Sequence, residues 1–173
     1  MRFVFRSLSI PVLVSLLVAC GQTAPPVRQA PPPVEAGVML KHIRDAGKSM
    51  ASAVEVQPLR EPSVDGFMKQ AESLESQGKL TDAVSQVDRA LKLAPDAPEI
   101  LQYRAELAVG LGRYSEAEPL ARKSYDLGPR LGSLCARNWQ TVVELRLAAQ
   151  DQAAVDSAKG QLATCLVKPP VRM

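Results

Sequence analysis

The chain has 173 residues, of which 46% are hydrophobic, 23% charged and only 4% aromatic, and its formal net charge is +3. This composition is too apolar for a disordered protein, and so few aromatic residues disfavour a β-sandwich or a β-barrel. Because the basic excess is small and both signs are mixed along the chain, we expect no binding to nucleic acid.

Residues 1–19 have the pattern of a secretory signal peptide. Two basic residues, Arg2 and Arg6, precede a mostly apolar run of 13 residues that ends before Cys20. A helix needs about 20 residues to cross the bilayer core, so this run is too short to span it and is typical of a cleaved signal. An uncleaved anchor with a chance cysteine is the alternative. Cleavage would leave 19 basic and 18 acidic residues.

The residues around the end of this segment, Leu17-Val18-Ala19-Cys20-Gly21, resemble the lipobox of bacterial lipoproteins. The resemblance implies that the chain is cut before Cys20, that its thiol is diacylated and that the new amino end is acylated, for example with palmitate. Two or more acyl chains anchor a protein stably to a membrane. Gly21, where aspartate would argue for the inner membrane, favours the outer membrane, with the protein facing the periplasm.

Residues 20–36 are predicted to be a lipidated cysteine followed by a periplasmic tether. The stretch contains five prolines and almost no large apolar residue. Such a sequence favours extended polyproline II and could hold a folded domain up to about 50 Å from the lipid, at about 3.1 Å per residue. A proline-rich ligand for a recognition domain is the alternative.

Residues 37–62 are predicted to form an amphipathic helix and a connector. The helix is expected over residues 38–56, where four apolar residues share one helical stripe, and Pro58 and Pro62 end the pattern. The stripe consists of Leu40, Ile43, Met50 and Val54. His42 is the one histidine of the chain and lies beside charged neighbours. We interpret it as a solvated residue and expect neither metal binding nor catalysis from it.

Beyond residue 63 the sequence repeats itself with a displacement of 34 residues. The residues that recur are Ala71, Glu72, Gly78, Ala83 and Pro95, which return as Ala105, Glu106, Gly112, Ala117 and Pro129. Over residues 64–129 this pattern resembles the tetratricopeptide repeat, a helix–turn–helix unit of that period. The resemblance implies an all-α solenoid of about three helical hairpins within residues 63–168.

Each recurring residue has a structural role in this interpretation. The alanines permit close helix contacts, and the glycines end the first helix of each hairpin. Thr81 and Ser115 are predicted to cap the second helices, and Asp96 to cap the helix that follows it.

A third hairpin is predicted for residues 133–166, with a turn at Ala149-Gln150-Asp151 and Asp151 as the cap of the last helix. Cys135 and Cys165 lie equally far from residue 150, so an antiparallel hairpin would bring them level. In an oxidising periplasm a disulfide is the expected state of such a pair. Two buried thiols are the alternative.

The chain has no phosphate-binding glycine loop, no nucleophile elbow and one isolated histidine, so we expect a binding protein rather than an enzyme. We accordingly expect no cofactor, no metal site and no small-molecule substrate. Stacked helical hairpins present a concave surface that binds peptides or proteins. The residues predicted to line this partner-binding groove are Met68, Glu72, Glu75, Tyr103, Glu106 and Arg137.

Within this groove Tyr103 is expected to be an exposed central contact whose removal leaves the fold intact. Glu72, Glu75, Glu99 and Glu106 are expected to make the surface acidic, although they could equally serve only to solubilise exposed helices. Arg89 and Lys92 are expected on the opposite, outer face.

The sequence therefore predicts an adaptor or scaffold, held by a lipid anchor at the outer membrane, that binds a protein or peptide in the periplasm. It resembles envelope lipoproteins that recruit peptidoglycan-remodelling enzymes or help to assemble secretion and pilus machines. One alternative is a pilotin-like assembly factor for a secretion or type IV pilus system. Another is an accessory subunit of an envelope enzyme.

Overall fold

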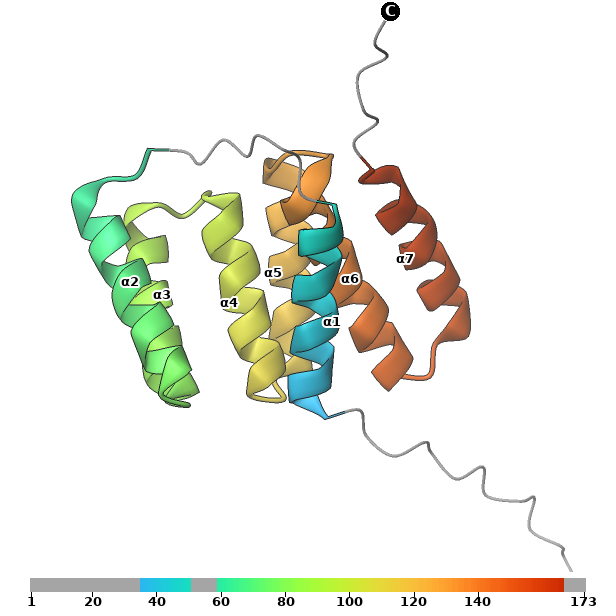
Figure 1. The fold of residues 1–173 in the computed structure, drawn as a ribbon, viewed down its shortest axis with the longest axis horizontal. Helices are drawn as coiled ribbons and strands as arrows, with labels where there is room; N and C mark the ends of the chain where they lie inside the picture. Colours follow the sequence, from blue (N-terminus) through green and yellow to red (C-terminus); the bar gives the residue numbers. More distant parts are fainter. Residues whose placement is uncertain (1–34, 51–58, 167–173) are drawn as a thin grey trace, which may run out of the picture. The chain divides into compact units, whose positions relative to one another are not determined.

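The computed structural model describes residues 35–50 and 59–166, and these residues form seven α-helices and no strand (Figure 1). The helices are α1 (Ala36–Ser49), α2 (Pro62–Ser76), α3 (Leu80–Leu93), α4 (Pro98–Gly110), α5 (Tyr114–Leu127), α6 (Gly132–Ala148) and α7 (Gln152–Thr164). The predicted signal peptide, Cys20 and nearly all of the tether lie outside the described residues, as does the second part of the helix expected over residues 38–56.

Helices α2 to α7 form three successive hairpins. In each hairpin two neighbouring helices pack against each other, and α3 packs on α4 as α5 packs on α6 (Figure 1). The four repeated alanines, Ala71, Ala83, Ala105 and Ala117, are fully buried. The structure thus confirms the all-α solenoid that the 34-residue displacement predicts.

The turns of the first two hairpins depend on glycine. Gly78 and Gly112 have φ angles of +75° and +70°, a left-handed conformation that glycine adopts at least cost. The third hairpin turns through Gln150, with φ +58°, and the Asp151 side chain accepts a hydrogen bond from the Ala154 N–H at 3.1 Å. The predicted position and cap of this turn are confirmed.

The other predicted caps are wrong. Helices α3 and α5 already begin at Leu80 and Tyr114, so Thr81 and Ser115 lie inside the helices and make no capping hydrogen bond. The residue that precedes α4 is Ala97 rather than Asp96. After each glycine turn the chain enters the next helix within two residues, which leaves no position for a capping side chain.

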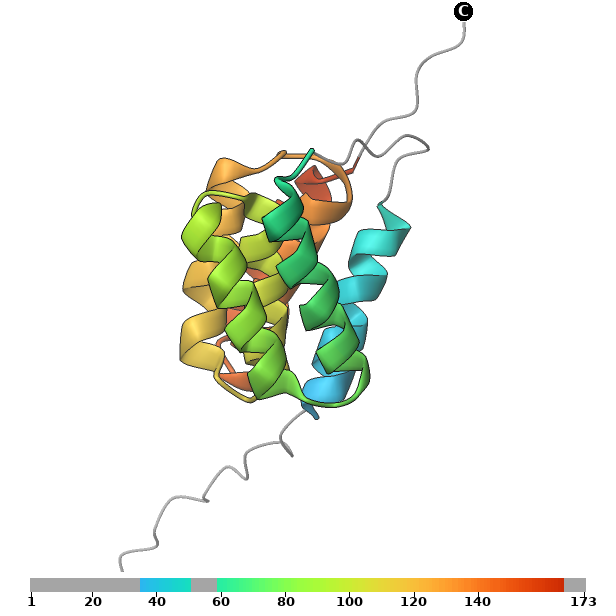
Figure 2. The same ribbon diagram turned by 90° about the vertical axis from the view of Figure 1, so that its left-hand side faces the viewer.

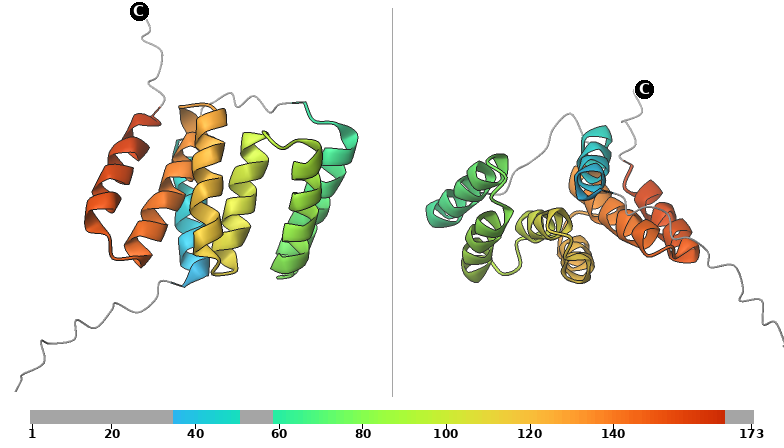
Figure 3. Two further views of the ribbon diagram at one scale, coloured as in Figure 1. Left: turned by 180° about the vertical axis from the view of Figure 1, so that it is seen from behind. Right: turned by 90° about the horizontal axis from the view of Figure 1, so that it is seen from below.

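Helix α1 packs on α4 and α6, on the face formed by the first helices of the hairpins, and not on the second helices (Figure 3). Its fully buried Met39 and Ile43 join a core cluster that includes Val109 and Leu145. Gly47 lies so close to α6 that a β-carbon in its place would be 2.6 Å from Arg137 Cγ. The helix begins earlier and ends earlier than predicted, at Ala36 and Ser49.

The last hairpin is closed by covalent and polar contacts. A disulfide joins Cys135 in α6 to Cys165 at the end of α7, with the two Cα atoms 5.6 Å apart. The N–H of Gly132 also donates a hydrogen bond of 2.8 Å to the carbonyl oxygen of Cys165. None of the helices in the described part of the chain combines the length and the apolar character that crossing a membrane requires.

Candidate functional site

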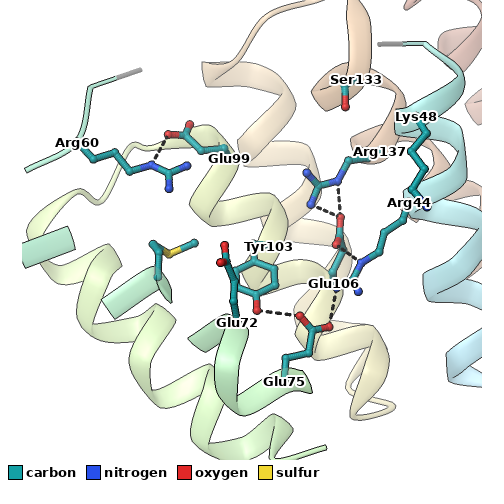
Figure 4. Close-up of a pocket in the computed structure, with 11 residues that line it drawn as sticks. Arg44, Lys48, Arg60, Glu72, Glu75, Glu99, Tyr103, Glu106, Ser133 and Arg137 are labelled. Atoms are coloured by element: carbon teal, nitrogen blue, oxygen red, sulfur yellow. Dashed lines mark hydrogen bonds and ion pairs between the residues drawn. The ribbon is translucent and has the colours of Figure 1, made fainter. Parts of the chain in front are cut away.

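A cavity of about 450 Å³ lies between α1, α2, α4 and the beginning of α6 (Figure 4). We call it the groove. It is lined by Arg44, Lys48, Arg60, Met68, Glu72, Glu75, Glu99, Tyr103, Glu106, Ser133 and Arg137. The six residues that the sequence pattern assigns to a groove are all among them, so the structure brings together side chains from three hairpins.

The walls of the groove carry opposite charges. Helix α2 contributes Glu72 and Glu75, and α1 contributes Arg44 and Lys48 from the other side of the cavity (Figure 4). Figure 2 shows the same two helices side on, with α4 behind them. The basic wall thus comes from a helix outside the tetratricopeptide-like hairpins.

Glu106 is the centre of a buried ion-pair network beneath the groove. Its side chain is 0% exposed, and Arg44 Nε donates to Oε2 at 3.1 Å. Its other carboxylate oxygen, Oε1, accepts hydrogen bonds from Arg137 Nε at 2.7 Å and from Gln102 Nε2 at 3.0 Å. A buried carboxylate with so many donors holds helices in place, since losing any donor would leave charge uncompensated. The expectation that Glu106 belongs to an exposed acidic surface is therefore wrong.

Arg44 connects this network to α2. Its Nη2 atom donates to Glu75 Oε1 at 2.6 Å, so one guanidinium joins α1 to both α2 and α4. Burial by itself disfavours the charged form of Arg44, but Glu106 and Glu75 outweigh it and raise the pKa of the guanidinium above its ordinary value. The side chain stays charged at any pH at which the protein is folded.

Tyr103 forms the floor of the groove and is only 8% exposed. Its ring belongs to the hydrophobic core with Met68 and Leu107, and its hydroxyl donates to Glu75 Oε2 at 2.8 Å. Burial and this hydrogen bond raise the pKa of Tyr103 above its usual range, so the phenol stays protonated. The expectation of an exposed aromatic whose removal spares the fold is wrong, because α1 and α2 cover the residue.

Two charged side chains of the groove remain open to an external ligand. Glu72 is exposed and has no hydrogen bond or ion pair with any other residue that the structure describes. The Lys48 side chain is 77% exposed, and its contact is with Asp45 of the same helix, at 3.2 Å. By contrast, Arg60 Nε is held by Glu99 Oε1 at 3.3 Å.

Residues outside the groove behave largely as their sequence context indicates. His42 is exposed, although its Nδ1 lies 3.0 Å from the buried Glu144 Oε1. Arg89 and Lys92 are exposed on α3, where the Arg89 guanidinium stacks 4.2 Å above the Phe67 ring. Within the described ranges, no group of three or more histidine, cysteine or acidic side chains is arranged to hold a metal ion.

Sequence reasoning missed four residues of the groove, namely Arg44, Lys48, Arg60 and Ser133. Arg44 and Lys48 lie on α1, whose docking on the hairpins no repeat pattern reveals. The available signal was Gly47, since a glycine in a helix costs stability unless close packing requires it. Its four-residue spacing from Ile43 and Met39 marks the face that packs.

Comparisons with known proteins agree with this fold. Residues 68–131 match the family model of the tetratricopeptide repeat, which confirms the resemblance over these residues. The structure is similar to that of the globular C-terminal domain of LpoP from P. aeruginosa, with a TM-score of 0.52 and 24% sequence identity over 58% of this chain and 99% of that chain. At this identity the similarity concerns the fold alone. No curated protein sequence matches the chain significantly.

Proposed function

We propose that the protein is a periplasmic adaptor, held at the outer membrane by a lipid on Cys20, that binds a segment of another protein in the groove. Helical-hairpin solenoids use their concave surface to bind peptides and proteins. The observation that carries the proposal is the cavity of about 450 Å³ on that surface, which keeps Glu72 and Lys48 open while the arginines around it are paired.

The position of α1 narrows the proposed binding surface. Because α1 packs on α4 and α6, it covers the part of the concave face that these helices form. The partner segment is therefore expected between α1 and α2, over Tyr103. A cavity of this size lies within the range of about 300–1,000 Å³ that is usual for small ligands, so it suits a few residues rather than a whole helix.

The proposed location rests on the sequence of the amino-terminal segment. A signal peptide followed by the lipobox-like residues before Cys20 supports lipidation, and Gly21 supports the outer membrane. A proline-rich tether of about 50 Å would let the groove reach partners at a distance from the lipid.

Site-specific photo-crosslinking in intact cells tests the proposal. A photoreactive amino acid replaces Glu72 in the groove or, as the control, Asp156 on the exposed face of α7. We expect the same adduct with one envelope protein from position 72 and from position 48, and none from position 156. A secretin in the adduct would favour an assembly factor over an adaptor. Equal labelling from both faces would refute groove binding.

A further inference from the structure

The charges around the groove balance in number but not in position. Four cationic residues, Arg44, Lys48, Arg60 and Arg137, face four carboxylates, Glu72, Glu75, Glu99 and Glu106. A ligand therefore gains little from its net charge. What distinguishes one ligand from another is where its charges lie.

Most of these charges already have partners within the protein. Arg44 joins Glu75 and Glu106 at 2.6 and 3.1 Å, and Arg137 joins Glu106 at 2.6 Å. The Arg60–Glu99 pair closes another corner at 3.3 Å. The two charges left for a ligand lie on opposite walls, with the Glu72 carboxylate on α2 and the Lys48 ammonium on α1 (Figure 4).

An extended peptide can meet both walls at once. Successive side chains of an extended chain project to opposite sides. A segment in which basic and acidic residues alternate thus presents all its basic side chains to one wall and all its acidic side chains to the other. A segment with separate basic and acidic blocks presents both signs to each wall, so attraction and repulsion oppose each other.

We propose that the groove selects an extended partner segment with alternating basic and acidic residues, whose basic side chains contact Glu72 and whose acidic side chains contact Lys48. This inference rests on the proposed function and specifies the class of segment that the adaptor recognises.

Two synthetic hexapeptides with acetylated and amidated ends test the inference. In one, lysine and glutamate alternate, and in the other three lysines precede three glutamates, so length, composition and net charge are equal. Each is titrated into the full-length protein and followed by NMR. Exposed ion pairs contribute about 0.2–1 kcal/mol each, so two of them should give the alternating peptide a roughly 2- to 30-fold tighter Kd. Equal affinities, or no binding of either peptide, would overturn the inference.

Charge-swap variants distinguish the pattern from bulk electrostatics. Glu72→Lys makes both walls basic and should abolish the preference for the alternating peptide. Combining Glu72→Lys with Lys48→Glu exchanges the walls, and the preference should return because a shift by one residue matches the peptide again. Asp156→Lys makes the same charge change on α7, which packs only on α6, and should leave the preference intact. A double variant without recovery would count against the inference.

The two proposals can fail separately. A crosslinked partner at position 72 together with equal peptide affinities would retain the adaptor and refute the alternating pattern. Peptide selectivity without any crosslinked protein would do the reverse.

Discussion

Replacing Gly47 with alanine tests how closely α1 is docked. The added β-carbon would lie 2.6 Å from Arg137 Cγ, 2.8 Å from Arg137 Cδ and 3.1 Å from Ser133 Oγ. The Arg137 stem cannot move away cheaply, because Glu106 holds its guanidinium by contacts of 2.7 and 2.6 Å. Overpacking of this kind costs about 1–3 kcal/mol.

Helix propensity acts in the opposite direction, because alanine is favoured over glycine in a helix by about 0.5–1 kcal/mol. The net expectation for Gly47→Ala is a loss of about 1 kcal/mol. Gly66 in α2 and Gly160 in α7 provide matched controls, since no atom lies within 4 Å of a β-carbon built at either position. There the propensity gain stands alone, and alanine should stabilise by about 0.5–1 kcal/mol.

Urea unfolding measures the global free energy in each variant, and amide hydrogen exchange measures the local opening of α1. Gly47→Ala should accelerate exchange within α1 more than elsewhere, whereas the two control variants should not. If Gly47→Ala stabilises the protein as much as Gly160→Ala does, α1 does not pack on α6 as closely as the structure indicates.

Four further predictions concern single contacts. Reducing the Cys135–Cys165 disulfide opens a loop with a sequence separation of 30, and chain entropy predicts a loss of roughly 3–4 kcal/mol. Unchanged melting on reduction, or two free thiols by intact mass, would contradict this. Glu106→Gln should destabilise by roughly 2–4 kcal/mol because it leaves two buried arginine contacts uncompensated; a loss below 1 kcal/mol in urea unfolding would count against the network. The raised pKa of Tyr103 means that the unfolded chain loses its phenol proton first, so stability should fall above about pH 10. Tyr103→Phe should flatten that fall in pH-dependent unfolding, and an identical slope would refute it. Cys20→Ala should block incorporation of labelled palmitate, and labelling of the variant would refute lipidation at this residue.

The repeated part of the fold could be predicted because its signals are local. Gly78 and Gly112 mark turns by their conformational freedom, and the 34-residue displacement of Ala71 and Ala83 identifies helix contacts within each hairpin. Asp151 could likewise be recognised as a cap from its position after an apolar run. These features depend on a few consecutive residues and on one repeat length.

The docking of α1 could not be predicted in the same way. The apolar stripe through Leu40 and Met50 suggested a face of α1, yet the residues that pack most closely are Met39, Ile43 and Gly47. Whether a separate helix covers a repeat surface depends on contacts between residues far apart in the chain. The Arg44–Glu106 pair joins residues 62 positions apart.

The same limitation explains the errors at Tyr103 and Glu106. On α4 alone both residues face the concave side, which in an uncovered solenoid would be open to solvent. Arg44 neutralises Glu106 and helps to enclose Tyr103, so side chains expected to contact a partner instead hold α1, α2 and α4 together.

The most direct test of the account is a hydrogen-exchange footprint of the protein bound to its crosslinked partner. With saturating partner, amide exchange should slow in α2 around Glu72, in α4 around Tyr103 and in the last turn of α1 around Lys48, while α3, α5 and α7 should be unaffected. Protection confined to α3, α5 or α7 would contradict binding in the groove.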